Sequence, residues 1–166
     1  MIDELLRALQ HSAFANWVQG TAYPIVITLH SVGLALLVGL LVIIDLRVLG
    51  FGRGLPLPAL RKFMTVVWIG FWTNALSGVM LFSIDARKDF YSPLFRIKLA
   101  AIAIGLILGA VIKSSVLSRT EQFGAADARS PARVKVLAAL SLLCWASAIV
   151  AGRLLAYFTF GDVGIE

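Results

Sequence analysis

Charged residues are scarce in this chain, and their scarcity limits what the protein can be. Only 14% of the 166 residues are Asp, Glu, Lys or Arg, whereas about 25% is usual for a globular domain. Hydrophobic residues make up 60%, which is more than one small core could bury. This composition excludes a disordered chain and a coiled coil, and it argues against a soluble enzyme. A single cysteine excludes a disulfide-stabilised scaffold.

Familiar catalytic motifs are also missing. The sequence contains no P-loop, no HExxH motif and no recognisable nucleophile–base pair. Cys144 stands alone and the methionines have no paired spacing, so copper binding is poorly supported. The net charge of +6 does not indicate nucleic acid, because the basic residues lie between apolar runs rather than along one face.

Long apolar runs are what the chain does have. Four of them are long enough to cross a bilayer as helices, at about residues 23–44, 63–84, 97–117 and 136–160. We therefore expect residues 21–166 to form one all-α domain, an integral membrane four-helix bundle whose first partner is the lipid bilayer. Pro24 suits the first turn of the first span, where its missing N–H costs nothing.

The first twenty residues differ from these runs. Apolar residues recur at helical spacing from Ile2 to Trp17, with Glu4 and Arg7 on the other side. This pattern predicts an amphipathic helix over residues 1–20 that lies in the membrane interface, anchored by Trp17. Residues 19–21 would turn the chain into the first span. The segment lacks the basic start of a signal peptide.

The distribution of basic residues predicts the orientation. Nine Lys and Arg residues lie in the first and third loops, and five lie in the N-terminal segment and second loop. Since cytoplasmic loops carry the excess of basic residues, both termini should be extracytoplasmic.

Titratable residues inside the spans are candidates for a functional site, because they are costly in a membrane. His30, Ser77 and Arg153 each lie seven residues from the extracytoplasmic end of their span, so they should share one polar layer. Arg96 and Lys98 should sit just above it, and Gly33 leaves room beside the imidazole for a flat ring or a helix. Because a guanidinium stays charged, Arg153 should point into the bundle or up to the outer interface, with a partner among Asp85, Asp89, Asp162, Ser77 and His30.

Such a layer has several interpretations. His30 is a candidate metal ligand to haem b, with Arg153 and Lys98 on the propionates. A quinone carbonyl would instead accept a hydrogen bond from His30 or Ser77, and an anion would also suit the layer. A lone histidine in a helix bundle is, however, more often only a hydrogen-bonded structural residue. His11 could supply a second haem ligand only if the N-terminal helix folded back over the bundle.

Helix contacts are predicted at several further positions. Asn74 should bridge helices by hydrogen bonds. Ala101, Gly105 and Gly109 form a stripe of small residues, which favours close packing within the bundle. Asp45 and Arg47 are expected at the inner end of the first span, as a charge pair at the interface that orients the helix.

The chain resembles an uncharacterised family of small four-helix bacterial inner-membrane proteins. The resemblance rests on Trp17-Val18, Tyr23-Pro24 and residues 30–39, 45–50, 68–70, 77–82, 93–98 and 151–157. It implies one four-span domain in the bacterial inner membrane and brings no activity. The sequence departs from the family at Ile27, where members tend to carry an acid. The architecture is also broadly similar to copper-resistance D and cytochrome b561-type membrane domains.

Two functions are consistent with these features. The first is a membrane accessory or small-molecule-binding subunit without catalytic chemistry of its own, working with other membrane or periplasmic subunits. The second is an electron-transfer subunit that binds haem b or a quinone around His30 and Arg153.

Overall fold

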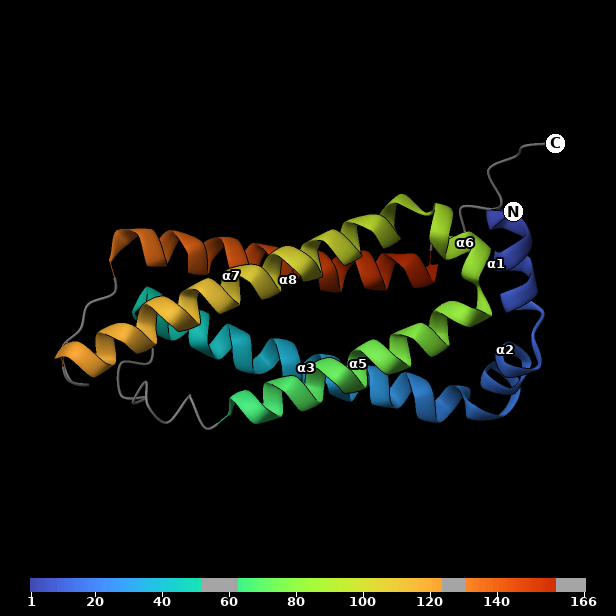
Figure 1. Ribbon diagram of the computed structural model, residues 1–166, viewed down its shortest axis with the longest axis horizontal. Helices are drawn as coiled ribbons and strands as arrows, with labels where there is room; N and C mark the ends of the chain where they lie inside the picture. The colour runs from blue at the N-terminus through green and yellow to red at the C-terminus, as the bar shows by residue number, and fades with distance from the viewer. Residues whose placement is uncertain (52–62, 124–130, 158–166) are drawn as a thin grey trace.

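The computed structural model describes residues 1–51, 63–123 and 131–157, and these residues form helices and no strand. Four long helices run side by side: α3 (Tyr23–Leu49), α5 (Met64–Ile84), α7 (Pro93–Phe123) and α8 (Ala132–Tyr157). All four lie in stretches that are long and apolar enough to cross a membrane. The predicted all-α four-helix bundle is therefore confirmed (Figure 1).

The predicted spans match these helices, although two helices are longer than expected. Pro24 does occupy the first turn of α3. α3 continues past residue 44 and ends at its C-cap residue Gly50, which has a φ of 109°. This left-handed conformation suits glycine, and the Gly50 and Phe51 amides both donate to the Leu46 carbonyl.

The N-terminal segment is not the single helix that its periodicity predicted. It consists of α1 (Ile2–Gln10), α2 (Ala13–Trp17) and a π-helical turn, η1 (Val18–Ala22), that runs directly into α3. The break falls at Ser12, whose hydroxyl accepts a hydrogen bond from the Ala15 amide at 3.1 Å and so begins a new helix. The turn expected at residues 19–21 is replaced by η1.

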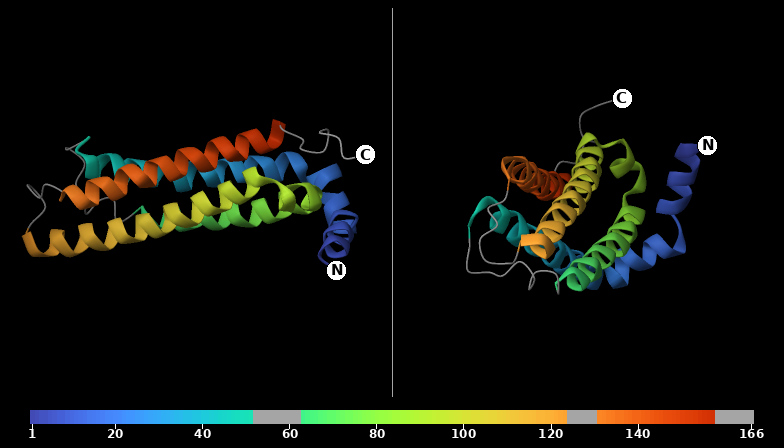
Figure 2. Two further views of the ribbon diagram at one scale, coloured as in Figure 1. Left: turned by 90° about the horizontal axis from the view of Figure 1, so that it is seen from above. Right: turned by 60° about the vertical axis from the view of Figure 1, so that its left-hand side comes forward.

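A short helix, α6 (Ala86–Tyr91), lies in the second loop and packs against α1. Asp3 of α1 contacts α6 at two points. The Asp3 Oδ1 atom accepts a hydrogen bond from the Tyr91 hydroxyl at 3.2 Å and lies 3.5 Å from Arg87 Nε. α1, α2 and α6 together are called the cap below. Figures 1 and 2 show α1 and α6 at the end of the bundle where α3 begins and α5 ends.

Close contact between glycine backbones sets the α3–α5 packing. A Cβ added at Gly33 would lie 2.7 Å from the Asn74 nitrogen, and one added at Gly70 would lie 2.8 Å from the Leu37 nitrogen. Only glycine allows two helices to approach this closely.

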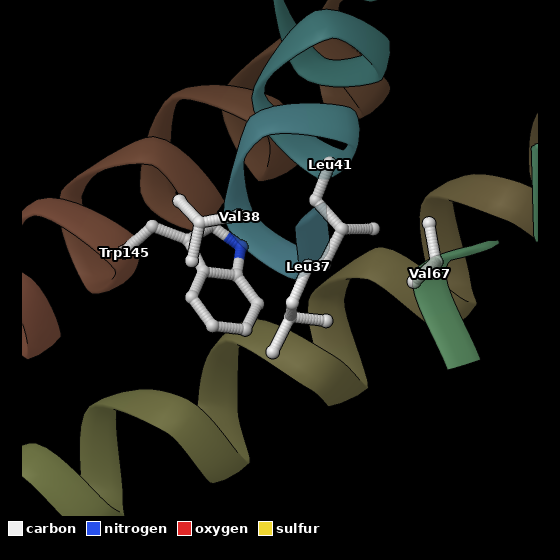
Figure 3. Close-up of a cluster of buried hydrophobic side chains, with 5 residues drawn as sticks. All are labelled: Leu37, Val38, Leu41, Val67 and Trp145. Carbon is white, nitrogen blue, oxygen red and sulfur yellow. The ribbon is translucent and has the colours of Figure 1, made fainter. Parts of the chain in front are cut away.

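Trp145 of α8 fills the centre of the bundle. It is 1% exposed and packs with Leu37, Val38, Leu41 and Val67 (Figure 3). An added Cβ at Gly105 of α7 would lie 3.0 Å from the indole, so the predicted packing of the small-residue stripe within the bundle is confirmed at this position.

Candidate functional site

His30 lies on α3, about two turns from the start of the helix, and faces α5. Its Nδ1 is 3.1 Å from the Asn74 carbonyl oxygen and 3.1 Å from Ser77 Oγ. A carbonyl can only accept, so Nδ1 donates and carries the proton. In the neutral ring, the lone pair is then on Nε2, which has no hydrogen-bond partner among the described residues.

Two residues of α5 orient this imidazole. The Asn74 amide donates to the His30 carbonyl at 2.8 Å, which confirms the predicted bridge between helices. Ser77 Oγ donates to the Thr73 carbonyl at 2.6 Å, and this leaves its lone pairs available to the His30 N–H. Asn74 and Ser77 are both buried, so the ring is held by groups that water does not reach freely.

Two glycines make room for this arrangement. An added Cβ at Gly78 would lie 3.2 Å from His30 Cε1, so the imidazole occupies the space that a side chain at residue 78 would need. Sequence reasoning missed Gly78, although its position next to Ser77 on the same helix was a usable signal. Of the two occupants considered beside Gly33, a flat ring or a helix, the structure places helix α5 there.

Lys98 of α7 approaches the same region from the opposite side of the bundle. Its ammonium acts electrostatically on the His30 ring. Its side chain crosses α8 at Gly152, where an added Cβ would lie 3.5 Å from Nζ. Lys98 is partly buried and forms no hydrogen bond or ion pair with a described residue. All four long helices thus contribute to the surroundings of His30 and Lys98.

The other predicted basic residues do not join this group. Arg153 is exposed and donates to the Tyr157 hydroxyl at 3.0 Å, with its guanidinium 5.1 Å from the centre of the same ring. The prediction that Arg153 bonds to Asp85, Asp89, Ser77 or His30 is therefore wrong. Asp162, the remaining expected partner, lies outside the residues that the structure describes. Tyr157 satisfies the guanidinium locally because it lies one turn further along α8. Arg96 is also exposed.

Asp89 of α6 lies in the cap and interacts electrostatically with Lys98. Burial, and to a smaller extent the neighbouring Asp85, raise the pKa of this carboxyl to about 6 against the opposing effect of Lys88 and Lys98. Asp89 is thus an acidic group beside Lys98 that is only partly ionised near pH 6.

His11 is exposed at the end of α1. Within the described residues, no three His, Cys, Asp or Glu side chains are grouped so as to hold a metal ion. Comparisons of the chain with protein-family models, with curated proteins and with solved structures find no match.

Proposed function

We propose that this protein is an integral membrane accessory subunit that binds a small molecule and has no catalytic chemistry of its own. The observation that supports this function is that His30 and Lys98 lie in one polar region of the bundle. An oriented imidazole with an unpartnered Nε2 and a partly buried ammonium that acts on it electrostatically lie inside a bundle of helices long and apolar enough to span a membrane. Polar groups are costly in such a place and are usually retained for a function.

The chemistry of the pair indicates the kind of ligand. An ammonium favours a negatively charged group or a carbonyl oxygen, and the imidazole can accept a proton or hydrogen bond at Nε2. A quinol-type head group would satisfy both at once, because its hydroxyl can donate to Nε2 while an oxygen accepts from the ammonium. An anion or a quinone carbonyl would bind the ammonium directly and would need a second proton on the imidazole to bind Nε2. The Asn74 and Ser77 contacts keep the ring in one orientation, which reduces the entropy lost on binding.

Haem b is a second candidate, and one contact favours it. Histidines that ligate a metal usually donate their other ring N–H to a carbonyl or carboxylate, as His30 does to the Asn74 carbonyl. His30 would then be the axial ligand through Nε2, and Lys98 would face a propionate. Arg153 is not proposed for this role, because it is exposed and bonded to Tyr157.

The test is to identify what the purified protein retains. The full chain is purified in mild detergent, its visible spectrum is recorded before and after reduction, and an organic extract is analysed by mass spectrometry. His30→Gln and Lys98→Gln should lose the retained molecule while keeping the fold. His11→Gln is the matched control, because it changes the other histidine at an exposed position. A Soret band that shifts on reduction would select haem, and equal retention in the His30 and His11 variants would refute the site.

We further propose that the protein lies in the bacterial inner membrane with both termini outside the cytoplasm. The excess of basic residues in the first and third loops supports this orientation. A reporter that is active only in the cytoplasm, fused after Glu166, should be silent. A strong signal would reverse the orientation and place His30 near the cytoplasmic face.

A further inference from the structure

A second polar group lies far from His30, near the other end of the bundle. Asp45 of α3 is only 2% exposed and is one turn from the end of its helix. It lies between two apolar clusters, one built around Trp145 and the other around Val48, Ile112, Val134 and Ala138. Its Oδ2 atom is buried and has no hydrogen-bond partner among the described residues.

Two more buried polar atoms without a described partner come from α8: Ser141 Oγ and Trp145 Nε1. Ser141 and Trp145 are four residues apart and so share one face of α8. Leu41, one turn before Asp45 on α3, packs with Trp145 in the central cluster (Figure 3). Because α3 and α8 run antiparallel, Asp45 comes next to Ser141, and the Ser141 hydroxyl acts on the Asp45 carboxyl as a hydrogen-bonding neighbour. Asp45 and Ser141 thus meet at one contact between two membrane helices, and Trp145 lies one turn further along α8.

Ionisation of the Asp45 carboxyl is energetically unfavourable in this position. Burying an ionised carboxylate without a counter-ion is far more costly than burying a neutral one. No charged side chain of the described residues acts electrostatically on Asp45. Among the side chains that the structure describes, the basic residues at this end are Arg47 on α3, Lys113 on α7, and Arg133 and Lys135 on α8, while α5 carries no ionisable side chain. Arg47 is about 200° around the helix from Asp45.

The polar atoms of Asp45, Ser141 and Trp145 favour a proton over a metal cation as the bound ion. A hard metal cation requires several oxygen ligands, and this site offers the oxygens of Asp45 and Ser141 together with an indole N–H, which can only donate. A neutral carboxylic acid fits better, because its O–H can donate toward Ser141 and its carbonyl can accept from Trp145, directly or through a water molecule.

We propose that Asp45, Ser141 and Trp145 form a proton-binding site within the membrane, in which Asp45 is held as a neutral carboxylic acid. Such an acid reacts with a membrane-soluble carbodiimide. The carboxyl proton moves to a carbodiimide nitrogen while the carboxyl oxygen bonds to the central carbon, and the adduct rearranges to a stable N-acylurea. No atom leaves, so the modified residue gains the whole mass of the reagent.

The test uses membranes that contain the full-length protein at pH 8, where Asp89 is ionised. After treatment with dicyclohexylcarbodiimide, peptide mass spectrometry should find the adduct at Asp45 and not at Asp3 or Glu4. A water-soluble carbodiimide with a glycine ester should give the reverse pattern. Ser141→Ala should change the labelling rate at Asp45, whereas Ser114→Ala, at an exposed serine, should not.

A second measurement tests the proposal even if dicyclohexylcarbodiimide does not reach Asp45. The infrared spectrum of the wild-type protein at pH 8 should contain a protonated carboxylic acid band that Asp45→Asn removes. If neither the adduct nor the band is found, the proposal is overturned. Labelling of Asp45 by the water-soluble reagent also overturns it, because the site would then be open to water. Protection by sodium ions at constant pH, with potassium as the control, would show a metal cation in place of the proton.

Discussion

The tightest contact between α3 and α5 supports a quantitative prediction for Gly33→Ala. The added methyl group would lie 2.7 Å from the Asn74 nitrogen and 2.9 Å from the Gly70 carbonyl oxygen. Both atoms belong to the backbone of α5, so a side-chain rotation cannot relieve the clash. The two helices would have to separate, and the 3.1 Å contact between His30 and the Asn74 carbonyl would lengthen with them.

The expected cost follows from studies of overpacked cores. Forcing an extra methyl group into a close-packed contact costs about 1–3 kcal/mol. For a chain of this length, each kcal/mol lowers the melting temperature by roughly 2–4 °C, so Gly33→Ala should melt about 2–12 °C below the wild type. Binding at His30 should weaken as well, because the imidazole loses its fixed orientation.

Gly39→Ala is a matched control in the same helix. No atom lies within 4 Å of an added Cβ at Gly39, so the methyl group meets open space. Alanine also stabilises a helix relative to glycine by roughly 0.5–1 kcal/mol, so this variant should be as stable as the wild type or slightly more stable. Tryptophan fluorescence of both proteins in the same detergent, followed during heating, gives the comparison. Equal melting temperatures for the two variants would refute the close approach of α3 and α5.

Three further predictions concern single side chains. Asn74→Leu removes the 2.8 Å hydrogen bond to the His30 carbonyl and should cost about 0.6–2 kcal/mol, measured by the same thermal assay; no change would show that the bond is not formed in the membrane protein. The pKa of Asp89 is raised from 3.8 to about 6 in the folded protein, which therefore holds this proton more tightly than the unfolded chain. Stability should be greatest below about pH 4 and decrease as the pH rises through about 6, and Asp89→Asn should flatten the melting temperature across this range. Arg153→Leu should cost no more than about 1 kcal/mol, because Arg153 is exposed and its only described partner is Tyr157; a loss of several kcal/mol would place the guanidinium inside the bundle.

The location of the spans and the depth of polar residues along them could be predicted from the sequence. The length of an apolar run is a local property, because it depends on the thickness of the bilayer and the rise of a helix. The positions of His30 and Ser77 along their helices predicted that they would meet, and they do. The same reasoning identified Asn74 as a bridge between helices.

The direction in which each side chain points was decided by tertiary packing. Residue spacing gives depth, but the rotation of each helix about its axis depends on which neighbours it packs against. The contacts at Gly33 and Gly70 turn His30 toward α5, while Arg153 at a similar expected depth points outward to Tyr157. Likewise, Asp45 was expected at the edge of the membrane and is instead enclosed, because Ser141 and Trp145 of α8, distant in sequence, face its side of α3.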